Sequence, residues 1–183
     1  MTRTALATAL AALATGCWFP SEPGDARLPG EELGTYAVVG TLDPGTCGAG
    51  ALGAPAVWRF EVRLSRDASS LYWLNGEAPI EGTVGADGAF EIVSETRVGV
   101  LEPERDQPGC GVIRRDRAAG RLDGAALDVP SFAGELRYEY ASVPGSDCSA
   151  LVGADGGFER LPCALGFALS ATRVRAPGDG DAR

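Results

Sequence analysis

The heptapeptide Trp58-Arg59-Phe60-Glu61-Val62-Arg63-Leu64 decides the fold class of this 183-residue chain. Apolar side chains occupy every second position, and charged side chains occupy the positions between them. Successive side chains of a β-strand point to opposite faces of the sheet, so this alternation is typical of a strand with one buried face. The stretch therefore predicts a half-buried β-strand.

Two later stretches show the same alternation. Residues 132–140 carry apolar or aromatic side chains at even positions from Leu136 to Tyr140, and residues 165–169 carry them at odd positions. Weaker strand patterns cover residues 35–43, 70–74, 80–84, 89–94, 111–117 and 121–129. No segment of the domain has the periodicity of an amphipathic helix. The sequence therefore predicts eight or nine short antiparallel strands in sequence order.

Turn signals separate the predicted strands. Asn75-Gly76 and Asp87-Gly88 are dipeptides typical of tight primed hairpin turns, in which both central residues have positive φ. Ala119-Gly120 and Pro130-Ser131 indicate two further reversals. A meander of this kind is all-β and closes into an up-and-down, calycin-like barrel or folds into a two-layer sandwich.

The N-terminal segment has the features of an export signal. Arg3 precedes an apolar run, Ala5–Ala14, that is too short to span a bilayer, which needs about 20 residues. Leu13-Ala14-Thr15-Gly16-Cys17 resembles the lipobox of bacterial lipoproteins, although Leu13 lies one place earlier than the family's usual leucine. The resemblance implies cleavage after Gly16, acylation of Cys17 with fatty acids such as palmitate, and membrane anchoring. An ordinary cleavable signal of a soluble exported protein is the alternative.

The lipobox and the composition together divide the chain into four expected parts. Residues 1–16 are expected to be the signal peptide, and residues 17–33, rich in Pro, Gly and acidic side chains, a flexible tether. Trp18, where an inner-membrane lipoprotein would carry Asp, favours the outer membrane. Residues 34–175 suit a single β domain, and residues 176–183 are expected to be a disordered tail.

Four cysteines remain once Cys17 is assigned to lipid. An even number in an exported domain predicts two disulfides among Cys47, Cys110, Cys148 and Cys163, and no close pair of the kind that zinc favours is present. If nine strands alternate in direction, the first two of these cysteines fall at one end of the sheet and the last two at the other. That count favours Cys47–Cys110 and Cys148–Cys163 over the two other connectivities.

The composition excludes many kinds of activity. The formal charge of −9 disfavours nucleic acid and anionic lipid surfaces as partners. The chain has no histidine, and its sixteen basic residues are all arginine. Mechanisms that need a histidine or lysine, and histidine metal sites, are therefore excluded. Carboxylate chemistry remains, but no acidic pair stands out, so we expect no catalytic residues, no metal and no cofactor.

Two groups of side chains are candidates for ligand binding. An eight-stranded barrel is just wide enough to hold a small ligand, and its lining is predicted to include Trp58, Tyr72, Trp73, Tyr138 and Tyr140. Alternatively, these aromatic residues simply fill the core. The barrel would resemble the lipocalins, but Gly34-Thr35-Tyr36 stands where that family has Gly-x-Trp.

The second group is basic. Arg114, Arg115, Arg117 and Arg121 are predicted to form an anion patch for a carboxylate or phosphate. Alternatively, they are the solvated face of a hairpin, neutralised by Asp116 and Asp123.

These observations predict a lipid-anchored envelope protein that acts as a non-catalytic binding or structural module. Its expected partners are the membrane, through the lipid anchor, and an envelope protein or small hydrophobic ligand, but not nucleic acid. One alternative is a carrier that encloses a small hydrophobic molecule within a barrel. A second alternative is a hydrolase with two carboxylates about 5 to 9 Å apart.

Overall fold

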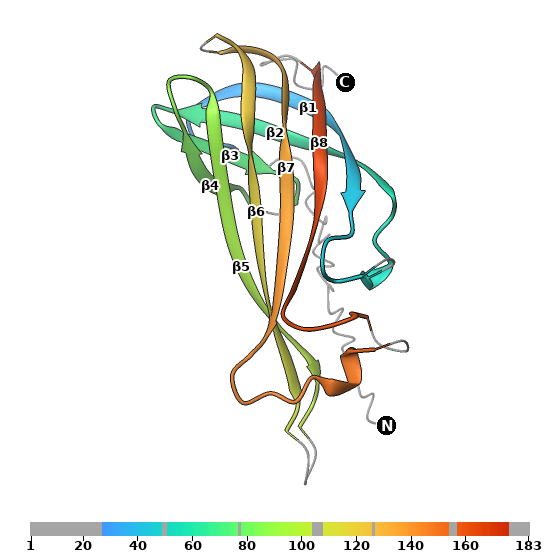
Figure 1. The fold of residues 1–183 in the computed structure, drawn as a ribbon. Helices are drawn as coiled ribbons and strands as arrows, with labels where there is room; N and C mark the ends of the chain where they lie inside the picture. Colours follow the sequence, from blue (N-terminus) through green and yellow to red (C-terminus); the bar gives the residue numbers. More distant parts are fainter. Residues whose placement is uncertain are drawn as a thin grey trace, which may run out of the picture.

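A computed structural model describes residues 27–48, 51–76, 78–103, 108–125, 127–153 and 157–175. Eight strands follow one another as antiparallel neighbours, and the last pairs with the first to close a barrel (Figure 1). This arrangement confirms the all-β meander and selects the up-and-down barrel over the sandwich. The strands are β1 (Glu31–Asp43), β2 (Val57–Asp67), β3 (Ser70–Leu74), β4 (Ile80–Val84), β5 (Ala89–Leu101), β6 (Cys110–Ala125), β7 (Asp128–Ser142) and β8 (Cys163–Arg175).

The barrel has two distinct ends. The β2–β3, β4–β5 and β6–β7 hairpins lie at one end, where β1 begins and β8 finishes. We call this the hairpin end. Two short 3-10 turns, η1 (Ala51–Gly53) and η2 (Ser149–Leu151), lie in the connections at the opposite end. No helix in the described ranges is long and apolar enough to cross a membrane.

The first strand begins at Glu31, before the expected domain boundary at residue 34. Leu28 and Leu33 are buried, and the Ser65 hydroxyl donates a 2.6 Å hydrogen bond to the Pro29 carbonyl. Residues 28–33 therefore pack with the barrel and are not part of a tether. The expected signal peptide, Cys17 and the expected C-terminal tail lie outside the described residues.

The described residues form eight strands and not nine, because one predicted turn does not exist. β6 is a single strand of 16 residues that runs straight through Ala119-Gly120. Gly120 pairs with Gly134 of β7, and a Cβ built on Gly120 would lie 2.8 Å from the Gly134 Cα. Glycine therefore allows two strands to approach closely here and does not mark a reversal. Pro130-Ser131, the other expected reversal, lies within β7.

Losing one strand from the count changes the position of the cysteines. Cys47 follows β1, Cys110 begins β6, Cys148 follows β7 and Cys163 begins β8, so all four lie at one end, which we call the disulfide end. The two expected disulfides are confirmed, but the predicted connectivity is wrong. The bridges are Cys47–Cys163, with a Cα–Cα distance of 4.9 Å, and Cys110–Cys148, with 4.8 Å. Each bridge joins strands that are neighbours in the barrel.

The predicted primed turns are also wrong, although the hairpins are in place. Gly88 has a φ of 81°, but Asp87, Asn75 and Gly76 do not have positive φ. At the β4–β5 hairpin the Gly85 N–H donates a 2.7 Å hydrogen bond to the Ala89 carbonyl, which closes a loop longer than two residues. A primed turn needs positive φ at both central residues or at the first, so neither dipeptide meets the requirement.

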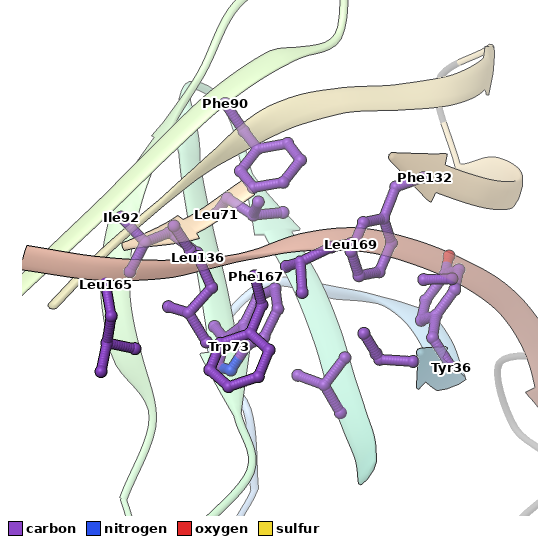
Figure 2. Packing of buried hydrophobic residues seen from close by; sticks show 14 of the residues in the cluster. Tyr36, Leu71, Trp73, Phe90, Ile92, Phe132, Leu136, Leu165, Phe167 and Leu169 are labelled. Atoms are coloured by element: carbon purple, nitrogen blue, oxygen red, sulfur yellow. The ribbon is translucent and has the colours of Figure 1, made fainter. Parts of the chain in front are cut away.

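Aromatic rings fill the interior at the hairpin end. Phe132 is almost fully buried, and its ring centroid lies 5.4 Å from that of Tyr36 and 5.8 Å from those of Trp73 and Phe90. Figure 2 shows these rings converging with Leu71 inside the barrel. The Tyr36 hydroxyl donates a 2.7 Å hydrogen bond to the Val129 carbonyl, and burial raises the pKa of Tyr36 to about 12. This half of the barrel is a packed core.

Candidate binding site at the disulfide end

The described strand pairing closes the barrel only toward the hairpin end. β3 and β4 have five residues each, and they pair with residues 63–67 of β2 and residues 90–92 of β5. Beyond these residues, the described parts of β2 and β5 have a ladder partner on one side only. Figure 1 shows β5, β6 and β7 extending well past β3 and β4.

Exposure along β5 shows that its inner face is open to solvent. Phe90 and Ile92 point inward and are buried. Thr96 and Val98 lie on the same face by strand alternation, yet both are exposed, Val98 to 49%. The inner face of β5 is therefore accessible at the disulfide end, whereas Val112 of β6 and Tyr140 of β7 are buried.

Six polar side chains occupy two adjacent rows of this inner face. In one row Ser94 of β5 pairs with Asp116 of β6, which pairs with Tyr138 of β7. In the next row, Thr96 pairs with Arg114, which pairs with Tyr140. We call these residues the polar grid: Ser94, Thr96, Arg114, Asp116, Tyr138 and Tyr140.

Mostly apolar rows border the polar grid. Toward the hairpin end, the next row is Ile92, Ala118 and Leu136. Toward the disulfide end, Val98 pairs with Val112, which pairs with Ser142 of β7. The polar grid therefore lies between an apolar row and a row of two valines and a serine, and a buried polar group is costly unless it is hydrogen-bonded.

An ion pair lies at the centre of the polar grid. Arg114 Nε lies 2.8 Å from Asp116 Oδ1, and Arg114 Nη2 donates a 2.9 Å hydrogen bond to Asp116 Oδ2. The guanidinium carbon also lies 5.5 Å from the centroid of the Tyr138 ring, within cation–π range. Burial raises the pKa of Asp116, and the neighbouring Arg114 opposes this rise. Because the two charges cancel, the polar grid carries no net charge.

The four hydroxyl groups of the polar grid are available to a ligand. Within the described part of the chain, the hydroxyls of Ser94, Thr96, Tyr138 and Tyr140 have no hydrogen-bond partner. Burial raises the pKa of both tyrosines, so their phenols stay neutral at physiological pH. Each hydroxyl can both donate and accept a hydrogen bond.

Aromatic side chains connect the polar grid to the open edge of β2. Trp58 and Phe60 are partly buried, and their ring centroids are 4.4 Å apart. Phe167 of β8 lies 5.6 Å from Trp58 and 6.4 Å from Tyr138, the latter in a perpendicular arrangement. These rings form the apolar border of the polar grid on the β8 side.

The structure separates the five aromatic residues that were predicted to line a cavity. Trp58, Tyr138 and Tyr140 lie along the inner face at the disulfide end, where Tyr140 is buried against Phe158, whereas Trp73 is buried in the core beside Phe132. Tyr72 alternates with Leu71 and Trp73, which places it on the outer face of β3.

The four arginines of the predicted anion patch do not share one surface. Arg114 faces inward, and the other three face outward along β6. Each of the outer three pairs with carboxylates: Arg115 with Glu95 at 3.1 Å, Arg117 with Glu91 at 2.5 Å and Glu135 at 3.1 Å, and Arg121 with Asp87 at 2.9 Å. This arrangement matches the alternative of a salt-bridged, solvated face. Asp123, an expected partner, accepts a hydrogen bond from Ser131.

A pocket of about 440 Å³ lies near the disulfide end, lined mainly by outer-face residues of β5, β6 and β7 and also by Tyr140 of the polar grid. Glu95, Arg115 and Glu139 supply its charged lining. Glu95 pairs with Arg115 at 3.1 Å, and Glu139 pairs with Arg137 at 3.2 Å. Neither Trp58 nor Trp73 lines this pocket, so it is not the cavity expected for a hydrophobic ligand.

The sequence interpretation missed half of the polar grid. Ser94 and Thr96 were not singled out, and Asp116 was considered only as a surface partner of the arginines. The sequence did contain one signal that could have located these residues, namely the alternation of side chains along the strand. Arg114 and Asp116 are two residues apart and therefore share a face, which is the face of Val112 and Ala118.

Comparisons of this chain with models of known protein families, with curated proteins and with solved structures found no match. Its function is therefore inferred from the chemistry of the site.

Proposed function

We propose that this protein is a lipid-anchored module of the bacterial cell envelope that binds a ligand on the polar grid and catalyses no reaction. The observation that supports binding is the polar grid itself. The Nε atom of Arg114 and the Oδ1 atom of Asp116 are buried and make no hydrogen bond to a described group, and four neighbouring hydroxyls bond no described protein group. A ligand that hydrogen-bonds to the buried pair and replaces water at the hydroxyls would be favoured here.

Two features support binding over the alternatives. A carrier for a hydrophobic molecule needs an enclosed apolar cavity, but aromatic side chains fill the interior at the hairpin end. A carboxylate-dependent hydrolase needs two cooperating carboxylates, and Asp116 has an arginine as its partner.

The anchor rests on the N-terminal sequence and on the disulfides. Leu13–Cys17 resembles a lipobox, and Cys17 is the cysteine left over when the other four pair. Disulfides persist in oxidising compartments such as the periplasm and the cell surface. Trp18 favours the outer membrane as the destination.

Replacing Cys17 with Ser tests the anchor. We expect the parent protein to incorporate radiolabelled palmitate and to enter the detergent phase, whereas the Cys17→Ser protein is unlabelled and remains uncleaved. A Cys110→Ser/Cys148→Ser protein is the matched control, because it loses two cysteines and their disulfide but keeps the lipobox, and it should still be labelled. Equal detergent partitioning of parent and Cys17→Ser would overturn the anchor.

Native mass spectrometry of the protein extracted from its own membranes tests binding. The expected spectrum shows the acyl mass, the loss of four hydrogens for two disulfides, and a retained ligand. An Arg114→Ala/Asp116→Ala protein should lose that ligand, while Glu95→Ala/Arg115→Ala, which removes an ion pair of the outer pocket, should keep it. Retention by the first variant and loss by the second would assign binding to the outer pocket.

A further inference from the structure

We infer that the ligand of the polar grid is a neutral saccharide, bound through its hydroxyl groups to the ion pair and phenols and through its apolar ring face to the neighbouring aromatic residues. This inference rests on the proposed function, because it names the ligand class of the same site.

The first argument is the balance of donors and acceptors. Arg114 offers N–H donors and Asp116 offers carboxylate acceptors, side by side and with cancelling charges. Adjacent hydroxyls of a sugar ring each donate and accept, so one pair can bridge a guanidinium and a carboxylate at once. The phenols of Tyr138 and Tyr140 add two more groups of the same dual kind.

The second argument is the size of the site. Neighbouring strands lie about 4.8 Å apart, and side chains on one face repeat about every 6.7 Å along a strand. The polar grid covers three strands and two such positions, from Ser94 to Tyr140. Its Cα positions therefore span about 10 Å by 7 Å, an area that roughly two sugar rings would cover.

The third argument is the aromatic border. Sugars present a flat face of C–H groups that packs against aromatic rings. Trp58 is a partly exposed ring of this border, and the buried Phe167, between it and Tyr138 at 5.6 Å and 6.4 Å, supports it from below. Aromatic rings supply large contact areas at little cost in conformational entropy, and the indole N–H of Trp58 can also donate a hydrogen bond.

Two other ligand classes fit less well. An anion such as phosphate would have to displace Asp116 from Arg114, which would leave the Asp116 carboxylate, 20% exposed, without its partner. A fatty acid would lay its chain on six polar groups, since the apolar interior beyond Ile92 and Leu136 is filled. A ligand with neutral hydroxyl groups neither separates the ion pair nor places an apolar chain on polar groups.

An NMR titration tests the inference. The ¹⁵N-labelled mature chain, with Cys17 replaced by Ser to remove the acyl groups, is titrated with three probes. These are a panel of neutral oligosaccharides of glucose, galactose, mannose and N-acetylglucosamine, then dodecanoate, then inorganic phosphate. We expect at least one neutral oligosaccharide to shift the amides of residues 94–98, 112–116 and 138–141 and the Trp58 indole signal.

Variants assign the binding to the polar grid. Asp116→Asn keeps the shape of the side chain and should weaken binding at least about tenfold, because a charged hydrogen bond is lost. Tyr138→Phe should weaken it less. Glu95→Gln, which alters the outer ion pair with Arg115, should leave the affinity unchanged. Unchanged affinity in Asp116→Asn and Tyr138→Phe would overturn the inference.

The probes also separate this inference from the proposed function. If dodecanoate or phosphate shifts these amides and no saccharide does, the ligand class is wrong but the polar grid remains a binding site. If no probe shifts them, and the ligand retained in native mass spectra is unaffected by Arg114→Ala/Asp116→Ala, both are wrong.

Discussion

Arg114 and Asp116 form a two-point ion pair on the inner face of β6, with side chains 43% and 20% exposed. A pair in this position is held by mutual neutralisation, because each charge is partly removed from water. Removing one partner therefore leaves an uncompensated charge, whereas removing both partners does not.

Single substitutions of this pair should destabilise the fold more than the double substitution. Arg114→Ala leaves the Asp116 carboxylate half-buried and unpaired, which we expect to cost about 1 to 2 kcal/mol, less than for a fully buried pair. Arg114→Ala/Asp116→Ala removes both charges and should be less destabilised than either single variant. Urea unfolding of the four proteins measures the non-additivity. Additive losses would show that the two charges are independently solvated.

The two disulfides should contribute unequally to stability. Cys47–Cys163 joins residues 116 apart in the sequence, and Cys110–Cys148 joins residues 38 apart. The loop-entropy relation gives losses of about 5 and 4 kcal/mol for their removal, so Cys47→Ala/Cys163→Ala should be the less stable variant by about 1 kcal/mol. Denaturant unfolding measures the difference, and peptide mapping without reduction checks the connectivity. A Cys47–Cys110 peptide would contradict the eight-strand register.

Tyr36 should make the fold sensitive to alkali. Its pKa is about 12 in the folded protein, against an ordinary value of 10.0, because burial disfavours the phenolate. The unfolded chain therefore releases the proton first, so the contribution is intact below pH 10 and is lost as the pH rises from 10 to 12. A shift of this size corresponds to about 3 kcal/mol.

The Tyr36→Phe variant isolates this contribution. At pH 7 it should be less stable by about 1 kcal/mol, because the Val129 carbonyl loses its hydrogen bond. Between pH 10 and 12 its stability should fall less steeply than that of the parent in denaturant titrations. Tyr72→Phe is a suitable control, since Tyr72 lies on the outer face. Parallel curves for Tyr36→Phe and the parent would contradict the assignment.

Gly120 and Gly134 should not tolerate a side chain. A Cβ at either position would meet the backbone of the facing strand, including the partner glycine's Cα at 2.8 Å. We expect Gly120→Ala and Gly134→Ala each to cost about 1 to 3 kcal/mol, as overpacking does. Gly76→Ala is the control, because nothing lies within 4 Å of its Cβ position and no more than about 0.5 kcal/mol should be lost. Thermal unfolding of the three variants compares them.

The sequence was sufficient to predict the positions of strands whose two faces differ in polarity. Residues 58–64 and 165–169 alternate clearly, because one face packs in the core and the other meets solvent or small side chains. Two hairpin positions, at Asn75-Gly76 and Asp87-Gly88, also followed from turn-forming residues, whereas Ala119-Gly120 and Pro130-Ser131 lie within strands. Closure of β1 onto β8 could not be predicted, because alternation within each strand does not specify which distant strand becomes its partner.

The polar grid escaped prediction because it breaks the pattern on which strand prediction depends. Residues 114–117 are all charged, so inner and outer positions of β6 look alike in the sequence. Such a run suggests a surface hairpin, and Ala119-Gly120 completed that interpretation. The same error added a ninth strand and moved Cys148 and Cys163 to the wrong end. The missed polar grid on the inner face and the mistaken turn therefore had the same cause, the charged run at residues 114–117.

The start of β1 at the hairpin end determines how the molecule would stand on a membrane. If Cys17 is acylated as proposed, the ten residues from it to Arg27 extend at most about 36 Å. β6 alone spans about 50 Å from the hairpin end to Cys110. A connecting segment this short, attached at the hairpin end, favours an orientation in which the hairpin end faces the lipid and the barrel axis is steep to the membrane plane. The polar grid, which lies nearer the disulfide end, would then be held away from the bilayer surface.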